Sequence, residues 1–198
     1  KCPDQLIETD VEVDPHAELS GAYRYIGARG TVQRPTQTGP MMMFNNIKGF
    51  EDARVAIGML GCRERVGKLL GVEPSQLGHK MNEALKTPMA PVVIPQGKAA
   101  CQEVVHRVTD PGFDIRKLIP APTNTEEDAG PFITMGLVWA ADPETGEEDV
   151  TIHRQCLQAK DEISIYFVPG RHIGVFREKA EAQGKALPIS VSIGLDPA

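Results

Sequence analysis

Cysteine, aromatic residues and positive charge are all scarce in this sequence. Its 198 residues include 5% aromatic residues, and 21 basic side chains stand against 27 acidic ones. The four cysteines are Cys2, Cys62, Cys101 and Cys156, and no two of them form a CxxC pair. This scatter argues against zinc knuckles and thioredoxin-type chemistry, and so few cysteines argue against a disulfide framework in a long chain. We expect reduced thiols in a cytoplasmic protein.

Basic patches and long apolar runs are missing as well. The net charge of −6 argues against a nucleic-acid surface, because phosphate binding needs clustered positive charge. No apolar run approaches the roughly 20 residues that span a bilayer, and KCPDQLIETD at the start has no apolar signal segment. The sequence has no initiating Met and stops at GLDPA, directly after an expected strand. We therefore expect a piece of a longer protein, because a bare edge strand is a poor natural end.

What the sequence does contain is an ordinary globular composition, 41% hydrophobic and 24% charged, with enough residues for a sizeable core. Helix and strand patterns alternate as far as residue 110, which predicts an N-terminal α/β domain over residues 1–110. The expected elements are a helix over 16–29 that ends at Gly30, strands in MMMFNNIKG and RVAIGML, helices in ERVGKLLG and PSQLGHKMNEALK, and a short strand in PVVIP.

The stretch DPGFDIRKLIPAPTNTEEDAG is acidic, rich in proline and aperiodic. It is either a linker or an ordered functional loop. The apolar residues Phe113, Ile115, Leu118 and Ile119 favour the ordered loop, because they can anchor it to a core.

A β-rich domain is expected over residues 111–198. FITMGLVWA and VTIHRQCLQ are each predicted to form one strand, joined by a turn at DPETG, and ISIYFV and PISVSIG supply two more strands. RHIGVFREKAEAQG is predicted to form a helix that ends at Gly184 and turns Ile173, Phe176 and Ala180 to one face.

His172 is expected in the first turn of that helix, directly after Pro169-Gly170. The positive end of the helix dipole disfavours a charged imidazole there, so the ring stays neutral, as a metal ligand must be. A phosphate would also bind at this position. The alternative is a histidine that merely packs at a helix start.

Asp149 opens an expected strand, and Arg154 lies five residues later, in the middle of that strand. In the middle of an apolar strand, a guanidinium needs a partner, and its paired N–H groups suit a carboxylate ligand. The alternative is an internal ion pair with Glu147, Glu148 or Glu162. Taken by itself, Asp149 is interpreted as an acid at a turn end, where Asp is common. His153 points to the face opposite Arg154, and by this reasoning it is structural. We also expect structural or surface roles for His16, His79, His106 and Trp139.

The segments ITMGLVWAADPETG, DVTIHR, GRH and KALPISVSIGLDPA together resemble the UbiD-like decarboxylases. Two earlier stretches, ETDVEVDPHAELSGAYRYIGARGTVQRPTQTGPMMMFNNIKG and LIPAPTNTEEDAGPF, are similar to the subgroup that acts on hydroxybenzoates such as protocatechuate, 4-hydroxybenzoate and gallate. The resemblance implies an N-terminal α/β domain followed by a split β-barrel that binds a flavin. Residues 111–198 would then be the first part of that barrel.

The resemblance further implies reversible, non-oxidative decarboxylation with prenylated FMN, Mn²⁺ and K⁺. By position, Asp149 and His172 would be metal ligands, and Arg154 would be the catalytic residue that orients the substrate carboxylate. The family commonly has Asn where this chain has Asp149, and a carboxylate oxygen serves Mn²⁺ at least as well. The full set of cofactor-binding residues implied is Asp149, Thr151, Ile152, His153, Arg154, Arg171 and His172.

The family's third metal ligand and its catalytic glutamates would follow residue 198, so we expect these 198 residues alone to be inactive. The implied partners are a small aromatic acid, a flavin prenyltransferase that supplies the cofactor, and further copies of the full-length chain in a homo-oligomer. Two alternatives stay open. One is a decarboxylase of acrylic or heteroaromatic acids, and the other is a non-catalytic barrel that binds flavin or metal.

Overall fold

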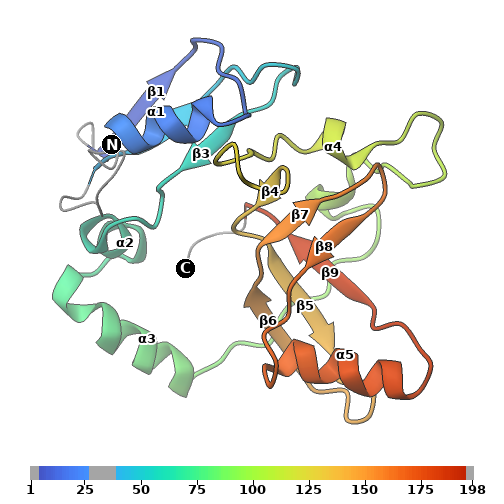
Figure 1. Cartoon of the computed structure of the whole chain (residues 1–198). Coiled ribbons are helices and arrows are strands. Elements are labelled where there is room, and N and C mark those ends of the chain that lie inside the picture. The colour runs from blue at the N-terminus through green and yellow to red at the C-terminus, as the bar shows by residue number, and fades with distance from the viewer. Residues whose placement is uncertain (1–4, 27–38, 195–198) are drawn as a thin grey trace.

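The structure is a computed structural model that describes residues 5–26 and 39–194 of the chain (Figure 1). It has a mixed α/β architecture, as the sequence predicts, with the described strands arranged in three small sheets of three strands each. One sheet lies in the N-terminal half and two lie in the C-terminal half. The described strands do not close into a barrel.

The N-terminal sheet has the order β1-β2-β3. β1 (Leu6–Thr9) runs parallel to β2 (Met41–Phe44), and β3 (Val55–Ile57) runs antiparallel to β2. Burial alternates along β2, so that Met42 and Phe44 point into the core, where Leu19 of α1 (Glu18–Ile26) packs against them. The predicted helix over 16–29 is confirmed for these residues, while Gly30 and the loop over 31–38 lie outside the described part.

Two helices follow the sheet. α2 (Arg63–Leu70) begins at Cys62, whose Sγ accepts from the Arg65 backbone N–H at 3.4 Å, and it ends at Gly71 in the left-handed conformation that glycine adopts easily. The short 3₁₀ turn η2 (Pro74–Gln76) leads into α3 (Leu77–Lys86). Only Leu77 of α3 is buried. Both helices match the prediction.

The side chain of Arg65 is buried, and its hydrogen-bond partners among the described residues are oxygen acceptors that carry no charge. Its guanidinium donates to the carbonyl oxygens of Met59 at 3.0 Å, of Gly39 at 3.0 Å and of Gln5 at 3.4 Å. Arg65 is 5% exposed, so these bonds satisfy a cation inside the protein. Arg65 thereby joins α2 to three other segments of the N-terminal half.

Residues 87–109 contain one 3₁₀ turn, η3 (Ala100–Gln102), and no buried residue. The predicted strand in PVVIP is wrong, because Val92 and Val93 are exposed and pair with no described strand. A strand exists only through hydrogen bonds to a neighbour. Pro91 and Pro95 lack the N–H groups that such bonds need at the two ends of this segment.

The loop over residues 110–130 is ordered, as its apolar residues predict. It contains the short helix α4 (Ile115–Leu118), capped by the Asp114 carboxylate, which accepts from the Arg116 backbone N–H at 3.0 Å. Ile115 and Ile119 pack against a buried cluster of Ala121, Ile133 and Leu157.

This loop is also bonded to the N-terminal half. The Ala17 backbone N–H donates to the Thr123 carbonyl at 2.8 Å, and the Thr123 N–H donates to the Pro15 carbonyl at 3.0 Å. The Ser20 hydroxyl donates to the Asn124 side-chain oxygen at 2.8 Å. Ala17 has φ 64°, a left-handed conformation that is unfavourable for a residue with a Cβ. The contact therefore holds Ala17 in a strained backbone.

The C-terminal half contains two sheets, with the orders β4-β7-β8 and β6-β5-β9. The strands of the first are β4 (Phe132–Ile133), β7 (Gln155–Leu157) and β8 (Ile163–Ile165), and those of the second are β6 (Glu148–Ile152), β5 (Leu137–Ala141) and β9 (Ile189–Ser192). All pairs in both sheets are antiparallel. The strand predictions in ISIYFV and PISVSIG are confirmed for β8 and β9.

FITMGLVWA and VTIHRQCLQ do not each form one strand, which corrects the sequence prediction. The first breaks between β4 and β5 and the second between β6 and β7, so each crosses from one sheet to the other. The crossings lie side by side, because the His153 backbone N–H donates to the Gly136 carbonyl at 3.2 Å. A Cβ at Gly136 would lie 2.7 Å from the amide nitrogen of the buried Gln155 side chain, so the corner needs glycine.

Helix α5 (His172–Ala182) covers one face of the β6-β5-β9 sheet (Figure 1). Its buried Ile173 and Phe176 pack against Val138 and Ala140 of β5. The chain leaves the helix through Gly184, at φ 67°. The predicted extent and buried face of this helix are confirmed.

No helix formed by residues 5–26 and 39–194 is both long enough and apolar enough to cross a membrane. Among the same residues, Cys62, Cys101 and Cys156 form no disulfide, and Cys2 lies outside the described part.

Candidate cofactor and metal site

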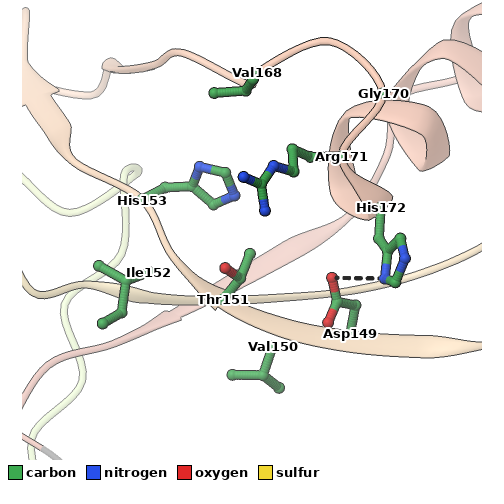
Figure 2. A pocket seen from close by; sticks show the side chains of 9 residues that line it. All are labelled: Asp149, Val150, Thr151, Ile152, His153, Val168, Gly170, Arg171 and His172. Carbon is green, nitrogen blue, oxygen red and sulfur yellow. Dashed lines mark ion pairs between the residues drawn. The ribbon is translucent and has the colours of Figure 1, made fainter.

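A pocket of about 540 Å³ lies between β6 and the loop that leads into α5 (Figure 2). One wall is β6 together with the residue that follows it, and the other wall is the turn before α5 and the first residue of the helix. The lining residues are Asp149, Val150, Thr151, Ile152, His153, Val168, Gly170, Arg171 and His172.

The pairing of β6 with β5 decides which of its side chains face α5. Asp149 pairs with Ala140, and Thr151 pairs with Val138. Directly paired residues of an antiparallel sheet share a face, and Val138 and Ala140 are the residues that pack under α5. Asp149 and Thr151 therefore point toward the helix, while Val150 points to the opposite side of the strand (Figure 2).

A tight turn brings the start of α5 next to β6. Gly170 has φ 76°, a conformation that glycine tolerates, and the Arg171 backbone N–H donates to the Val168 carbonyl at 3.2 Å. Gly174 of α5 lets this loop approach closely, since a Cβ there would lie 3.3 Å from the Val168 carbonyl oxygen. The predicted position of His172, in the first turn of the helix after Pro169-Gly170, is confirmed.

Asp149 and His172 meet across the mouth of the pocket. His172 Nδ1 lies 3.5 Å from Asp149 Oδ2, and the two side chains are 73% and 28% exposed. Both groups are therefore open to a ligand. A carboxylate oxygen and an imidazole nitrogen are two ligands that Mn²⁺ accepts. No group of three or more metal-ligating side chains forms among the described residues, so the pair needs further ligands to complete a site.

Positive charge and hydrogen-bond donors gather at the same end of the pocket. The first turn of α5 presents backbone N–H groups that have no partner within the helix. No side chain caps these groups at Arg171. The Arg171 side chain is exposed and extends back across the pocket toward His153 (Figure 2). Together with the Thr151 side chain, this end of the pocket has the composition of an anion site.

The ring of His153 forms the other end of the pocket. It packs edge-on against Phe167, with ring centroids 5.0 Å apart at 75°. Its Nε2 is buried and makes no hydrogen bond with the described residues. The spacing of the residues alone predicts a structural role for His153, whereas the family resemblance places it among the cofactor-binding residues. In the structure His153 lines the pocket, and so do five of the six other predicted cofactor-binding residues.

That exception is Arg154, and its predicted setting is wrong. It lies in the two-residue link between β6 and β7 instead of the middle of an apolar strand, and it is exposed and does not line the pocket. It also forms no ion pair with Glu147, Glu148 or Glu162. Its guanidinium carbon lies 4.4 Å from the centroid of the Phe132 ring, which is a cation–π contact.

Three pocket residues escaped the sequence reasoning. Val150 follows Asp149 on β6, and Val168 and Gly170 belong to the turn before α5. The only signal was the turn itself, VPG, which marks where the chain reverses without indicating that the loop forms a wall.

Two family models match the chain. The 3-octaprenyl-4-hydroxybenzoate carboxy-lyase N-terminal domain (UbiD_N) matches residues 2–85, and the Rift-related domain of the same carboxy-lyase (UbiD) matches residues 92–198. A gallate decarboxylase from Lactiplantibacillus plantarum is 55% identical over 197 residues, which is 99% of this chain and 40% of that protein. The chain thus spans well under half the length of this relative.

Solved structures of UbiD-class enzymes and of 3,4-dihydroxybenzoic acid decarboxylases are also similar to this chain. The apo structure of a 3,4-dihydroxybenzoic acid decarboxylase from Enterobacter cloacae is 57% identical, with a TM-score of 0.92 over 100% of this chain and 40% of that one. An evolved dimeric form of the UbiD-class enzyme HmfF from Pelotomaculum thermopropionicum, in complex with prFMN, is 28% identical, with a TM-score of 0.85 over 98% of this chain and 42% of that one. From its family matches, its relatives and its fold, the chain belongs to the UbiD family of carboxy-lyases.

Proposed function

We propose that the full-length protein catalyses the reversible, non-oxidative decarboxylation of a hydroxybenzoic acid of the protocatechuate type, with prenylated FMN as cofactor. The observation that carries this proposal is the pocket in which Asp149 and His172 meet at the start of α5, in a chain 55% identical to a gallate decarboxylase. The prFMN complex of HmfF supports the choice of cofactor.

The donors in the pocket fit this cofactor and its metal. Asp149 and His172 would hold Mn²⁺, with further ligands from the rest of the protein. Arg171, Thr151 and the first turn of α5 would bind the flavin phosphate together with K⁺, and Ile152 and His153 would line the flavin. When bound, prenylated FMN supplies the electron sink that takes up the electron pair released as CO₂ departs.

Arg154 would be the residue that orients the substrate carboxylate. Its guanidinium is exposed and forms no ion pair with the described residues, so its N–H groups are available to a ligand. Planar, paired donors match a carboxylate better than the point charge of a lysine does.

The finer features of the protein follow from the same family membership. We assign residues 1–110 to an N-terminal α/β domain and residues 111–198 to the first part of a split β-barrel. The rest of the chain would close the barrel and supply the third metal ligand and the acid–base glutamates. The full-length protein would act as a cytoplasmic homo-oligomer that receives its cofactor from a flavin prenyltransferase.

The test is decarboxylation by the full-length protein loaded with prenylated FMN, Mn²⁺ and K⁺. We expect CO₂ release from protocatechuate or gallate and none from acrylic or heteroaromatic acids. His172→Ala should lose bound manganese and activity and keep its melting temperature, because the exposed ring contributes little packing. His79→Ala, at an exposed position of α3, is the matched control.

Two results would contradict the proposal. Turnover of acrylic or heteroaromatic acids alone would move the protein to another substrate class. Flavin binding without turnover of any of these acids would favour the non-catalytic barrel. Normal manganese content in His172→Ala would remove that residue from the ligand set.

A further inference from the structure

Arg154 is held in place by an aromatic ring instead of by its own strand. It lies in the link between β6 and β7, where the chain crosses from one sheet to the other. Its side chain makes no hydrogen bond and no ion pair with the described residues, and its guanidinium carbon lies 4.4 Å from the centroid of the Phe132 ring. A long, exposed side chain without such a contact would sample more rotamers.

Phe132 is itself firmly placed. It is 9% exposed and belongs to β4, where it pairs with Cys156 of β7, two residues after Arg154. Its backbone N–H donates to the Pro122 carbonyl at 2.9 Å. The ring is therefore fixed by the β4-β7-β8 sheet and by the ordered loop before it.

The geometry of stacking leaves the guanidinium able to bind a ligand. A cation above an aromatic face is attracted by the ring electrons. The guanidinium carbon lies 4.4 Å from the centroid of the Phe132 ring, and a cation–π contact uses none of the five N–H groups of arginine as a hydrogen-bond donor to a protein acceptor. No described carboxylate neutralises the charge. An oriented, charged and unbonded guanidinium of this kind is suited to a carboxylate ligand.

We propose that Phe132 is a positioning residue that holds the Arg154 guanidinium in the orientation that receives the substrate carboxylate. This inference rests on the proposed function, in which Arg154 binds that carboxylate. Phe132 acts through Arg154 and has no role of its own in the chemistry.

The experiment compares two ligands that differ only in the carboxylate. Protocatechuate and catechol share the ring and both hydroxyl groups, and catechol lacks the carboxylate. The full-length protein is loaded with FMN in place of prenylated FMN, with Mn²⁺ and K⁺ present, so that equilibrium binding is measured separately from turnover. Calorimetry gives the Kd of each ligand for wild type, Phe132→Leu, Phe132→Tyr and Arg154→Ala.

We expect Phe132→Leu to raise the Kd of protocatechuate by about two- to fivefold, the contribution of one cation–π contact at an exposed site, and to leave the Kd of catechol unchanged. Phe132→Tyr keeps the ring and should bind both ligands like wild type. Phe132→Met is a second variant without a ring if Phe132→Leu fails to fold. Phe50→Leu, in the N-terminal half, is the matched control.

Three results would overturn the inference: an unchanged Kd for protocatechuate in the ring-free variants, an equal loss for both ligands, or no rescue by Phe132→Tyr. The proposed role of Arg154 is judged separately. If Arg154→Ala leaves the ratio of the two Kd values at its wild-type level, Arg154 does not bind the carboxylate and both proposals on this residue fall. If Arg154→Ala changes the ratio and Phe132→Leu does not, only the positioning role of Phe132 is lost.

Discussion

Arg65 in the N-terminal half and Gln155 in the C-terminal half are both buried polar side chains, but they differ in their partners. The Arg65 guanidinium donates to carbonyl groups from three separate segments. Gln155 is fully buried, and neither its amide nitrogen nor its amide oxygen has a hydrogen-bond partner among the described residues. The other such unpaired atoms belong to His153 and Arg177, also in the C-terminal half.

The two halves therefore differ in whether their buried polar side chains have hydrogen-bond partners among the described residues. Buried polar groups of native proteins are paired almost without exception, because an unpaired group loses its bonds to water and gains none. In residues 5–26 and 39–99, no buried side-chain nitrogen or oxygen lacks a hydrogen-bond partner. His153 and Gln155 flank Arg154 in the chain, whereas Arg177 lies in α5, where its Nε is 3.7 Å from a carboxylate oxygen of Glu181.

The largest expected change in stability comes from replacing Arg65, the buried side chain that has hydrogen-bond partners. Arg65→Met would leave the carbonyl groups of Met59, Gly39 and Gln5 without their donor, and we expect a loss of roughly 3 kcal/mol in the free energy of unfolding. The melting temperature of the full-length protein measures it. Arg63→Met is the control, because Arg63 is exposed and its side chain makes one hydrogen bond with the described residues, to the Pro74 carbonyl at 3.1 Å. Equal losses in the two variants would contradict the structural role of Arg65.

The same substitution at the unpaired residue should act in the opposite direction. Gln155→Met keeps the volume of the side chain and removes two buried atoms that have no partner. We expect the cofactor-free, full-length protein to gain about 1 kcal/mol in stability. A loss of that size would mean that the amide is bonded by a part of the protein beyond the described residues. The comparison between the two halves would then no longer hold.

The smallest expected change in stability concerns Asp142, a buried acid of the C-terminal half that has hydrogen-bond partners. Asp142 accepts from Lys179 Nζ at 2.6 Å and from the Glu144 backbone N–H at 2.8 Å. The hydrogen bond from Lys179, followed by that from the Glu144 backbone, lowers the pKa of Asp142 below its ordinary value of 3.8. A lowered pKa stabilises the folded state above the unfolded-state pKa, and this stability is lost as the pH falls through the folded-state value.

We therefore expect Asp142→Asn to lower the melting temperature by a constant amount between pH 5 and 7, a window above about pH 4 where an unperturbed Asp is ionised. The difference from wild type should shrink below pH 4. Asp161→Asn, at an exposed position, is the control and should show no such pH dependence. A difference that grows on acidification would show that the sign of the pKa shift is wrong.

The elements that sequence reasoning found are those whose pattern is local. The α5 helix was predictable because Ile173, Phe176 and Ala180 repeat at helical spacing and Gly184 ends the pattern. The two sheet crossings were not, because neither Gly136 nor His153 is accompanied by a Pro, Asn or Asp that would mark a turn within FITMGLVWA or VTIHRQCLQ. At the crossings the buried side chain of Gln155 lies beside Gly136, and this contact joins residues from different predicted strands.

The same limit explains the candidate site. Asp149 and His172 were singled out from their positions beside a strand and at a helix start, and the structure brings them together. Arg154 was singled out too, but its setting was misjudged, since a strand that ends at Ile152 cannot be told from one that continues. Its contact with Phe132 depends on how β4 and β7 pair, which no spacing along the chain reveals.

The bonds between Ser20 and Asn124 and between Ala17 and Thr123 have a consequence for how the protein is made. Ser20 and Asn124 are 104 residues apart in the chain. At a translation rate of about 5–20 residues per second, the ribosome needs roughly 5–20 s to synthesise the intervening segment. Once β3 has been made within that time, the N-terminal sheet and α1 can form without the loop that bonds to them, and Ala17 is not yet held in its left-handed conformation. The hydrogen bonds of Ala17 and Ser20 to this loop can therefore form only after the segment around Thr123 has left the ribosome.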